Sequence, residues 1–255
     1  AWEGLWFTLG DHPFGQDQIG RDVFARTMRG AQVSLMVMVI MGIIATVVGV
    51  LVGAIAGFYR GRTDNVLMRI TEVFIAIPAI VVTAVIGNKF GADNPALFGI
   101  VLGLLLWPGL ARLVRADYLT LREREFVDAA RVAGANDRTI MFGHILPNAI
   151  GVVIVNATLL MATATILEAA LSFLGFGIQP PNVSLGQLIN EYQTSFSTRP
   201  WLFWWPGFFI IVFALTINLI GDGLRDAFDP RQRRIPKTKE FKKQAVAKVE
   251  TEVAE

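Results

Sequence analysis

The sequence predicts an all-α membrane protein, a polytopic membrane helical bundle. Of its 255 residues, 53% are apolar before the 24 glycines are counted, and only 17% are charged. One soluble core could not bury that much apolar surface. Long uncharged runs alternate with short charged segments, and most basic residues fall on one side of these runs. These observations indicate a chain that crosses the membrane several times as helices.

Five uncharged runs predict five spans. Leu35–Phe58 has 24 residues, which make a helix of about 36 Å against a hydrocarbon core of about 30 Å. Val73–Gly87 has only 15 residues and needs the turn from Val66 to reach full length. The other three runs are Ala96–Ala111, Ile145–Leu167 and Trp201–Gly221.

Small residues and prolines are expected to shape these spans. Gly49, Gly53 and Gly57 recur every four residues in the first span, a pattern that lets two helix backbones approach closely in lipid. The spans are expected to kink at their prolines, which are Pro78, Pro108 and Pro206.

The distribution of Lys and Arg predicts the orientation. If the loop after the first span is cytoplasmic, the cytoplasmic segments hold 18 of the 23 basic residues and the other side holds five. The C-terminus is therefore predicted in the cytoplasm and residue 1 outside. Because the chain opens at Ala1 with neither an initiator Met nor a signal peptide, we expect a sixth span upstream that is missing here.

Three parts follow from this topology. Residues 1–34 are expected to be an extracytoplasmic segment, with an amphipathic helix over Gly20–Ser34 lying on the lipid surface. Residues 35–221 form the transmembrane domain, which includes a cytoplasmic segment over 117–144. Residues 222–255 form a polar cytoplasmic tail.

The 28-residue segment Asp117–His144 is polar, permits helix and is too long for a simple turn. Asp128–Gly134 is predicted to be a short helix with one bare face, ended by Gly134, and a second helix capped by Asn136 or Asp137 follows. Such a knob suits insertion into a partner's groove, and a solvated connector explains the pattern equally well. The candidate docking residues are Asp128, Ala129, Ala130, Ala133, Gly134, Ala135, Asn136 and Asp137.

Three ionisable residues are candidates for a pathway or gate. Glu168 follows 23 uncharged residues, so its carboxyl group should face a protein interior or a water-filled path. A structural pairing near the outer surface is the alternative. Arg69 and Glu72 lie three apart on one helical face, and we expect an ion pair there rather than a proton relay.

Other functional classes find little support. The chain has no Cys and two His, which predicts no metal site, and its net charge of +2 is not clustered as nucleic-acid binding requires. His12 and His144 lie outside the spans, so an intramembrane Ser–His hydrolase is excluded. An ion-coupled secondary transporter stays an alternative, although no inverted repeat supports it.

The cytoplasmic segment resembles a known signature. Asp128-Ala129-Ala130, Gly134 and Leu146-Pro147 are spaced like the EAA-x3-G-x9-I-x-L-P motif of permease subunits in ATP-binding-cassette (ABC) importers. The chain departs from it at Asp128, where Glu is usual, and at His144, where Ile is usual. Three further stretches resemble the second permease, dipeptide permease C-like, of dipeptide, oligopeptide and nickel importers: His12–Leu35, Glu168–Ile189 and Asn218–Arg233.

The resemblance implies the type I ABC importer permease fold in the cell membrane, with six spans and both ends cytoplasmic. It implies a homologous permease as partner, two ATPase subunits docked on the cytoplasmic segment, an extracytoplasmic substrate-binding protein and surrounding lipids. The chain has no G-x-x-x-x-G-K-[ST] loop, so it is expected to be a non-catalytic subunit without a cofactor, while the ATPases bind ATP and Mg. Short peptides are the expected substrate, with nickel or another chelated metal as the alternative.

Overall fold

The computed structural model describes residues 12–90 and 94–228. Within them the regular structure is helical, apart from an isolated bridge between Gln16 and Asp22. The elements in chain order are α1 (Val23–Tyr59), α2 (Gly61–Ala76), α3 (Ala79–Phe90), α4 (Pro95–Leu121), α5 (Glu125–Val132), α6 (Asp137–Thr139), a π-helix (Ile140–Ile145), α7 (Leu146–Phe173), α8 (Leu185–Tyr192), a 3₁₀ turn (Gln193–Ser195) and α9 (Trp201–Phe228).

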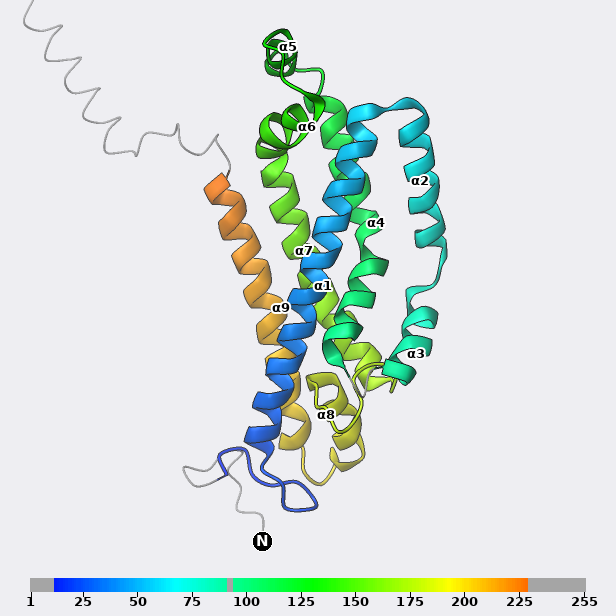
Figure 1. Cartoon of the computed structure of the whole chain (residues 1–255). Helices are drawn as coiled ribbons and strands as arrows, with labels where there is room; N and C mark the ends of the chain where they lie inside the picture. Colours follow the sequence, from blue (N-terminus) through cyan, green and yellow to red (C-terminus); the bar gives the residue numbers. More distant parts are fainter. Residues whose placement is uncertain (1–11, 91–93, 229–255) are drawn as a thin grey trace, which may run out of the picture.

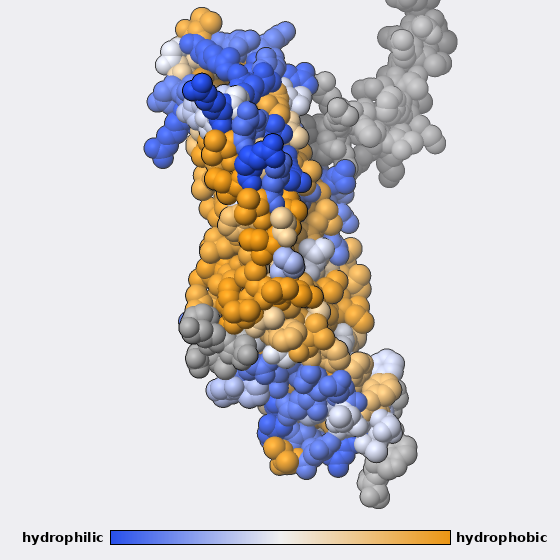
Figure 2. Space-filling model, turned by 90° about the vertical axis from the view of Figure 1, so that its right-hand side faces the viewer, coloured by the Kyte–Doolittle hydropathy of each residue, from blue (hydrophilic) through white to orange (hydrophobic). Residues whose placement is uncertain are grey.

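The long helices form an elongated bundle. In Figure 1, α1, α4 and α7 lie at its centre, α9 flanks one side, and α2 with α3 flanks the other. The α5 helix stands at one end and α8 at the opposite end, and we refer to the α5 end and the α8 end below. Figure 2 shows a hydrophobic belt between two hydrophilic ends on the α2–α3 side, the pattern of a membrane-embedded bundle.

The number of spans agrees with the sequence if a broken helix is counted. Four helices are long and apolar enough to cross a membrane, and α2 with α3 makes a fifth that is bent by 71°. The break falls at Ile77 and Pro78, where Ile77 has extended backbone angles. A proline disfavours helical geometry in the residue before it and cannot donate a backbone hydrogen bond. The kink predicted at Pro78 is therefore a full break.

The glycines of α1 pack directly against α4. A Cβ on Gly53 would lie 2.5 Å from the carbonyl oxygen of Ala111, and one on Gly57 would lie 2.6 Å from the Cβ of Tyr118. Gly49 lies against Leu110 in the same way. The predicted small-residue face is confirmed, and it brings α1 and α4 into backbone contact.

One predicted element is not formed. No separate surface helix covers 20–34, because Val23 already begins α1 and this helix continues without interruption to Tyr59. Asp22 caps it by accepting a hydrogen bond from the Phe24 backbone N–H. The local amphipathic pattern is overridden by continuation of the helix into the apolar run that follows.

Candidate functional site

Residues 122–139, which we call the knob, connect α4 to the π-helix at the α5 end. The α5 helix begins at Glu125, three residues before the predicted start, and ends at Val132. Gly134 follows with φ +81°, a left-handed conformation that glycine adopts at no steric cost. The Ala135 N–H donates to the Ala130 carbonyl at 3.0 Å and the Gly134 N–H to the Arg131 carbonyl at 2.9 Å. These two bonds make a Schellman turn, and Gly134 ends the helix as the sequence predicted.

The second cap belongs to Asn136. Its side-chain oxygen accepts a hydrogen bond from the Thr139 N–H at 2.8 Å, so Asn136 rather than Asp137 caps α6. Two caps within three residues fix the direction in which the chain returns from α5 to the bundle.

The knob presents most of its predicted docking residues outward. Ala130 is buried and Ala135 half-buried on the bundle side, and the space around a Cβ built on Gly134 is open. Val132, the last residue of α5, is 91% exposed. The exposed members of the predicted set are Asp128, Ala129, Ala133, Gly134, Asn136 and Asp137.

A small hydrophobic core joins the knob to the bundle. Val127 is fully buried and packs with Ala130 in one cluster that includes Tyr118 of α4 and Met141 of the π-helix. The Tyr118 hydroxyl donates to the Met141 carbonyl at 3.0 Å, and this carbonyl also accepts the Leu146 N–H. Tyr118 therefore fastens α4 to the wide turn at the start of α7, a role that the sequence did not suggest.

Two arginines join the knob to the end of α1. The Arg122 guanidinium donates to the Phe58 carbonyl and lies 5.9 Å from the centre of the Phe58 ring. Arg60 pairs with Glu123 at 2.9 Å. A cation at a helix C-terminus is favourable because it meets the negative end of the helix dipole. From the sequence alone, Arg60 and Arg122 contributed only to the count of basic residues that predicted the orientation.

Glu168 lies at the other end of the molecule. Its side chain is completely buried near the end of α7, and its Oε1 accepts a hydrogen bond from the Ser172 hydroxyl at 2.8 Å. The Oε2 atom is buried without a hydrogen bond from the described residues. The carboxyl group thus faces a protein interior, one of the two environments that its position in the sequence predicted.

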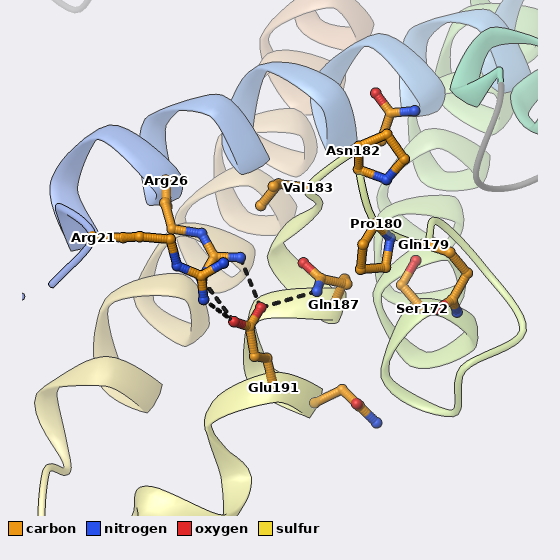
Figure 3. A pocket seen from close by; sticks show the side chains of 11 residues that line it. Arg21, Arg26, Ser172, Gln179, Pro180, Asn182, Val183, Gln187 and Glu191 are labelled. Carbon is orange, nitrogen blue, oxygen red and sulfur yellow. Dashed lines mark hydrogen bonds and ion pairs between the residues drawn. The ribbon is translucent and has the colours of Figure 1, made fainter. Parts of the chain in front are cut away.

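Charged side chains also form a network at the α8 end that the sequence did not predict. Arg26 of α1 reaches Glu191 of α8 with both terminal nitrogens, at 2.9 and 2.7 Å, and donates to the Tyr192 hydroxyl at 2.6 Å. Arg21 pairs with both Asp17 and Glu191. Figure 3 shows Arg21, Arg26 and Glu191 beside a cavity of about 380 Å³ that Gln187 also lines.

The electrostatics of this network are favourable. Hydrogen bonds from Arg26 lower the pKa of Glu191, against the opposing effect of burial. Burial alone would raise the pKa of Asp17, but hydrogen bonds from Arg21 and the Ile19 backbone outweigh it, and the pKa is lowered. Burial raises the pKa of Tyr192 to about 12. The acids stay ionised and the phenol stays neutral at physiological pH.

The family follows from comparison with known proteins. Residues 49–234 match the binding-protein-dependent transport system inner membrane component family. The chain belongs to this family. A putative peptide permease protein of Brucella ovis is 43% identical over 222 residues, covering 86% of this chain and 73% of the relative. The oligopeptide transport system permease protein OppC of Mycobacterium bovis is 38% identical over 225 residues, covering 88% and 77%.

A solved structure shows the same fold. The inward-facing MetNI methionine ABC transporter matches with a TM-score of 0.66 over 84% of this chain and 99% of that chain, at 19% identity. The permease therefore has the type I ABC importer permease fold. It is a multi-pass inner membrane protein and the permease subunit of an importer; such subunits are not themselves catalytic. A secondary transporter is not favoured.

The remaining pathway candidates of the permease are separate from Glu168. Arg69 and Glu72 form an ion pair at 2.8 Å on α2, as expected, and both side chains are exposed. No hydrogen bond or ion pair joins them to Glu168 within 12–90 and 94–228. Across these same ranges, no three His, Asp or Glu side chains lie close enough to hold a metal ion.

Proposed function

We propose that this permease imports short peptides, pairing with a homologous permease to enclose the pathway. Two ATPase subunits dock on the knob, and an extracytoplasmic binding protein delivers the peptide at the α8 end. ATP and Mg are bound by the ATPases. The observation that carries the ATPase contact is the double-capped knob with its bare, outward-facing residues, at the position of the permease signature. The names of the relatives support the peptide.

The mechanism follows from how the knob is attached. Closure of the ATPase dimer pulls on α5. The knob is joined to α1 through Arg122 and packs on Tyr118 of α4, whose hydroxyl in turn joins α4 to the start of α7. The π-helix transmits the same movement to α7. These three helices form the centre of the bundle (Figure 1), so motion at the knob reaches the α8 end without a further relay.

Reconstituted vesicles test the substrate. They hold this chain, its partner permease and the ATPases, and receive binding protein loaded with peptide, loaded with a nickel chelate or unloaded. We expect only the peptide-loaded protein to raise ATP hydrolysis. Stimulation by the nickel chelate alone would replace the peptide assignment and keep the importer assignment.

The orientation has its own test, which uses the absence of Cys from the chain. Ile19 is 73% exposed at the α8 end and Val132 is 91% exposed on the knob, so the two positions are matched in exposure and side-chain type. An impermeant maleimide should label Ile19→Cys in intact spheroplasts and Val132→Cys only after lysis. The reverse pattern would invert the topology.

A further inference from the structure

Glu168 is surrounded by three serines from three different elements. Ser172 is on α7 and donates to Oε1 at 2.8 Å, Ser34 is on α1, and Ser184 is the N-cap of α8. The hydroxyl groups of Ser34 and Ser184 are the other polar neighbours of the carboxyl group. All three serines are as buried as Glu168 itself.

Each of these hydroxyl groups also accepts a backbone N–H. Ser172 accepts the N–H of Ile178 at 3.1 Å. Ser34 accepts that of Leu185, and Ser184 accepts that of Gln187, both at 3.2 Å. The three donors all lie in residues 174–192, which turn back from α7 and form α8; we call this segment the α8 hairpin. Because a hydroxyl group has one proton to donate and lone pairs to accept with, each serine can join the hairpin backbone to the carboxyl group.

The hairpin lies directly on the helices around this site. A Cβ on Gly186 would lie 2.2 Å from the carbonyl oxygen of Ala169, and one on Gly177 would overlap the backbone of Ser172. A Cβ on Gly30 of α1 would lie 3.2 Å from the Ser184 carbonyl carbon. At these three points the hairpin backbone lies against the backbone of α1 and α7. The buried Ile178 and Leu188 side chains add apolar packing against the same helices, and the serine hydroxyls supply the polar contacts.

We propose that Glu168 is the positioning residue that seats the α8 hairpin on α1 and α7. Its carboxyl group accepts the Ser172 hydroxyl and lies beside those of Ser34 and Ser184, and the three hydroxyls hold the hairpin through its backbone N–H groups. The hairpin contacts α1 and α7, and these two helices run to the α5 end (Figure 1). This inference rests on the proposed function: a binding protein that arrives at the α8 end acts on α1 and α7 through this seat.

Labelling of a buried hairpin position tests the seat directly. Ile178 is fully buried in the hairpin, so Ile178→Cys in this Cys-free chain should be protected from a water-soluble maleimide in the purified transporter. In the Glu168→Ala background Ser172 loses its acceptor and all three serines lose the carboxyl group beside them, so we expect labelling to be about tenfold faster or more. Glu168→Gln, which keeps the volume and one acceptor oxygen, should fall between.

Thr163→Ala is the matched control. Thr163 lies on the same helix and its hydroxyl donates only to carbonyls of its own turn, at Leu159 and Leu160. Its labelling rate should equal that of the parent. If Glu168→Ala does not assemble, Ser34→Ala and Glu168→Gln carry the measurement, because each removes only part of the set. Continued protection of Ile178→Cys in these backgrounds would overturn the proposal.

Stimulation of ATP hydrolysis separates the seat from a pathway role. Because Glu168→Ala loosens the hairpin, this variant should keep the basal rate of ATP hydrolysis and lose the increase caused by loaded binding protein. If Glu168 were a carboxylate of the transport pathway, Glu168→Ala would reduce transport while Ile178→Cys stayed protected from labelling. That result would contradict the proposal. Failure of the parent transporter to respond to loaded binding protein would refute the proposed function alone, since labelling needs no substrate.

Discussion

The two ends of the bundle differ in how far their surfaces are engaged in contacts within the chain. At the α8 end the backbone N–H groups of the hairpin reach three buried serines, and its one acid, Glu191, is paired with Arg21 and Arg26. The knob satisfies its own backbone through two caps but leaves Val132 and the small residues around Gly134 bare. The α8 end is therefore held to the bundle by polar contacts within the chain, whereas we propose that the exposed surface of the knob is left for a partner.

The largest effect is expected from bulk on the knob. Ala133→Trp adds a large side chain at an exposed position with an ordinary helical backbone, so the isolated chain should fold while the ATPase contact is blocked. We expect copurification of the ATPase to fall about tenfold or more, as loss of a close-packed contact implies.

Gly134→Asn is the matched variant for that experiment. Asn tolerates the left-handed conformation that the Schellman turn requires and adds less volume than Trp. It should retain most of the ATPase. Equal retention by Ala133→Trp would show that the bare face is not the docking surface, and the contrast between the two ends would fail.

The next effect concerns the seat of the hairpin. Gly186→Ala places a methyl group 2.2 Å from a backbone oxygen of α7, and overpacking against backbone costs about 1–3 kcal/mol. The melting temperature of the purified transporter should fall. Gly207→Ala, where nothing lies within 4 Å of the added Cβ, should cause no loss. Similar melting temperatures for both variants would show that the hairpin is loosely seated.

A smaller effect is expected at the base of the knob. Tyr118→Phe keeps the buried ring and removes the hydrogen bond to Met141, which is worth about 1 kcal/mol. The Met141 carbonyl keeps its bond from Leu146, so the fold should persist. Denaturant unfolding measures the change, and stimulation of ATP hydrolysis should weaken as α4 is freed from α7. An unchanged response would exclude Tyr118 from the transmission.

The smallest effect is the pH dependence of the α8 end. The folded-state pKa values of Asp17 and Glu191 are lowered, so their contribution to stability is complete above the ordinary carboxyl pKa of about 4 and is lost as the pH falls through the folded-state values. The melting temperature of Glu191→Gln should fall less steeply than that of the parent between pH 5 and pH 3 (about one unit either side of that pKa). Parallel curves would show that the network adds nothing.

Local sequence was enough for the knob because its turns use neighbouring residues. Gly134 and Asn136 act within five residues of their partners, and glycine or asparagine at such positions has a direct conformational reason. The start of α5 at Glu125 was missed because the alanine pattern marked only the bare part of the helix.

The sequence by itself determined what depends on composition and short-range order: apolar runs long enough to span a bilayer, a distortion at Pro78, the glycine face of α1 and the caps of the knob. Tertiary structure alone decided the environment of Glu168 and the pairing of Arg26 with Glu191. Segments distant in the chain meet at both places: Ser34 and Leu185 are 151 residues apart, and Arg26 and Glu191 are 165 apart. Such contacts form only when helix packing offsets the entropy lost in bringing distant segments together. No local sequence pattern indicates which distant segments will meet.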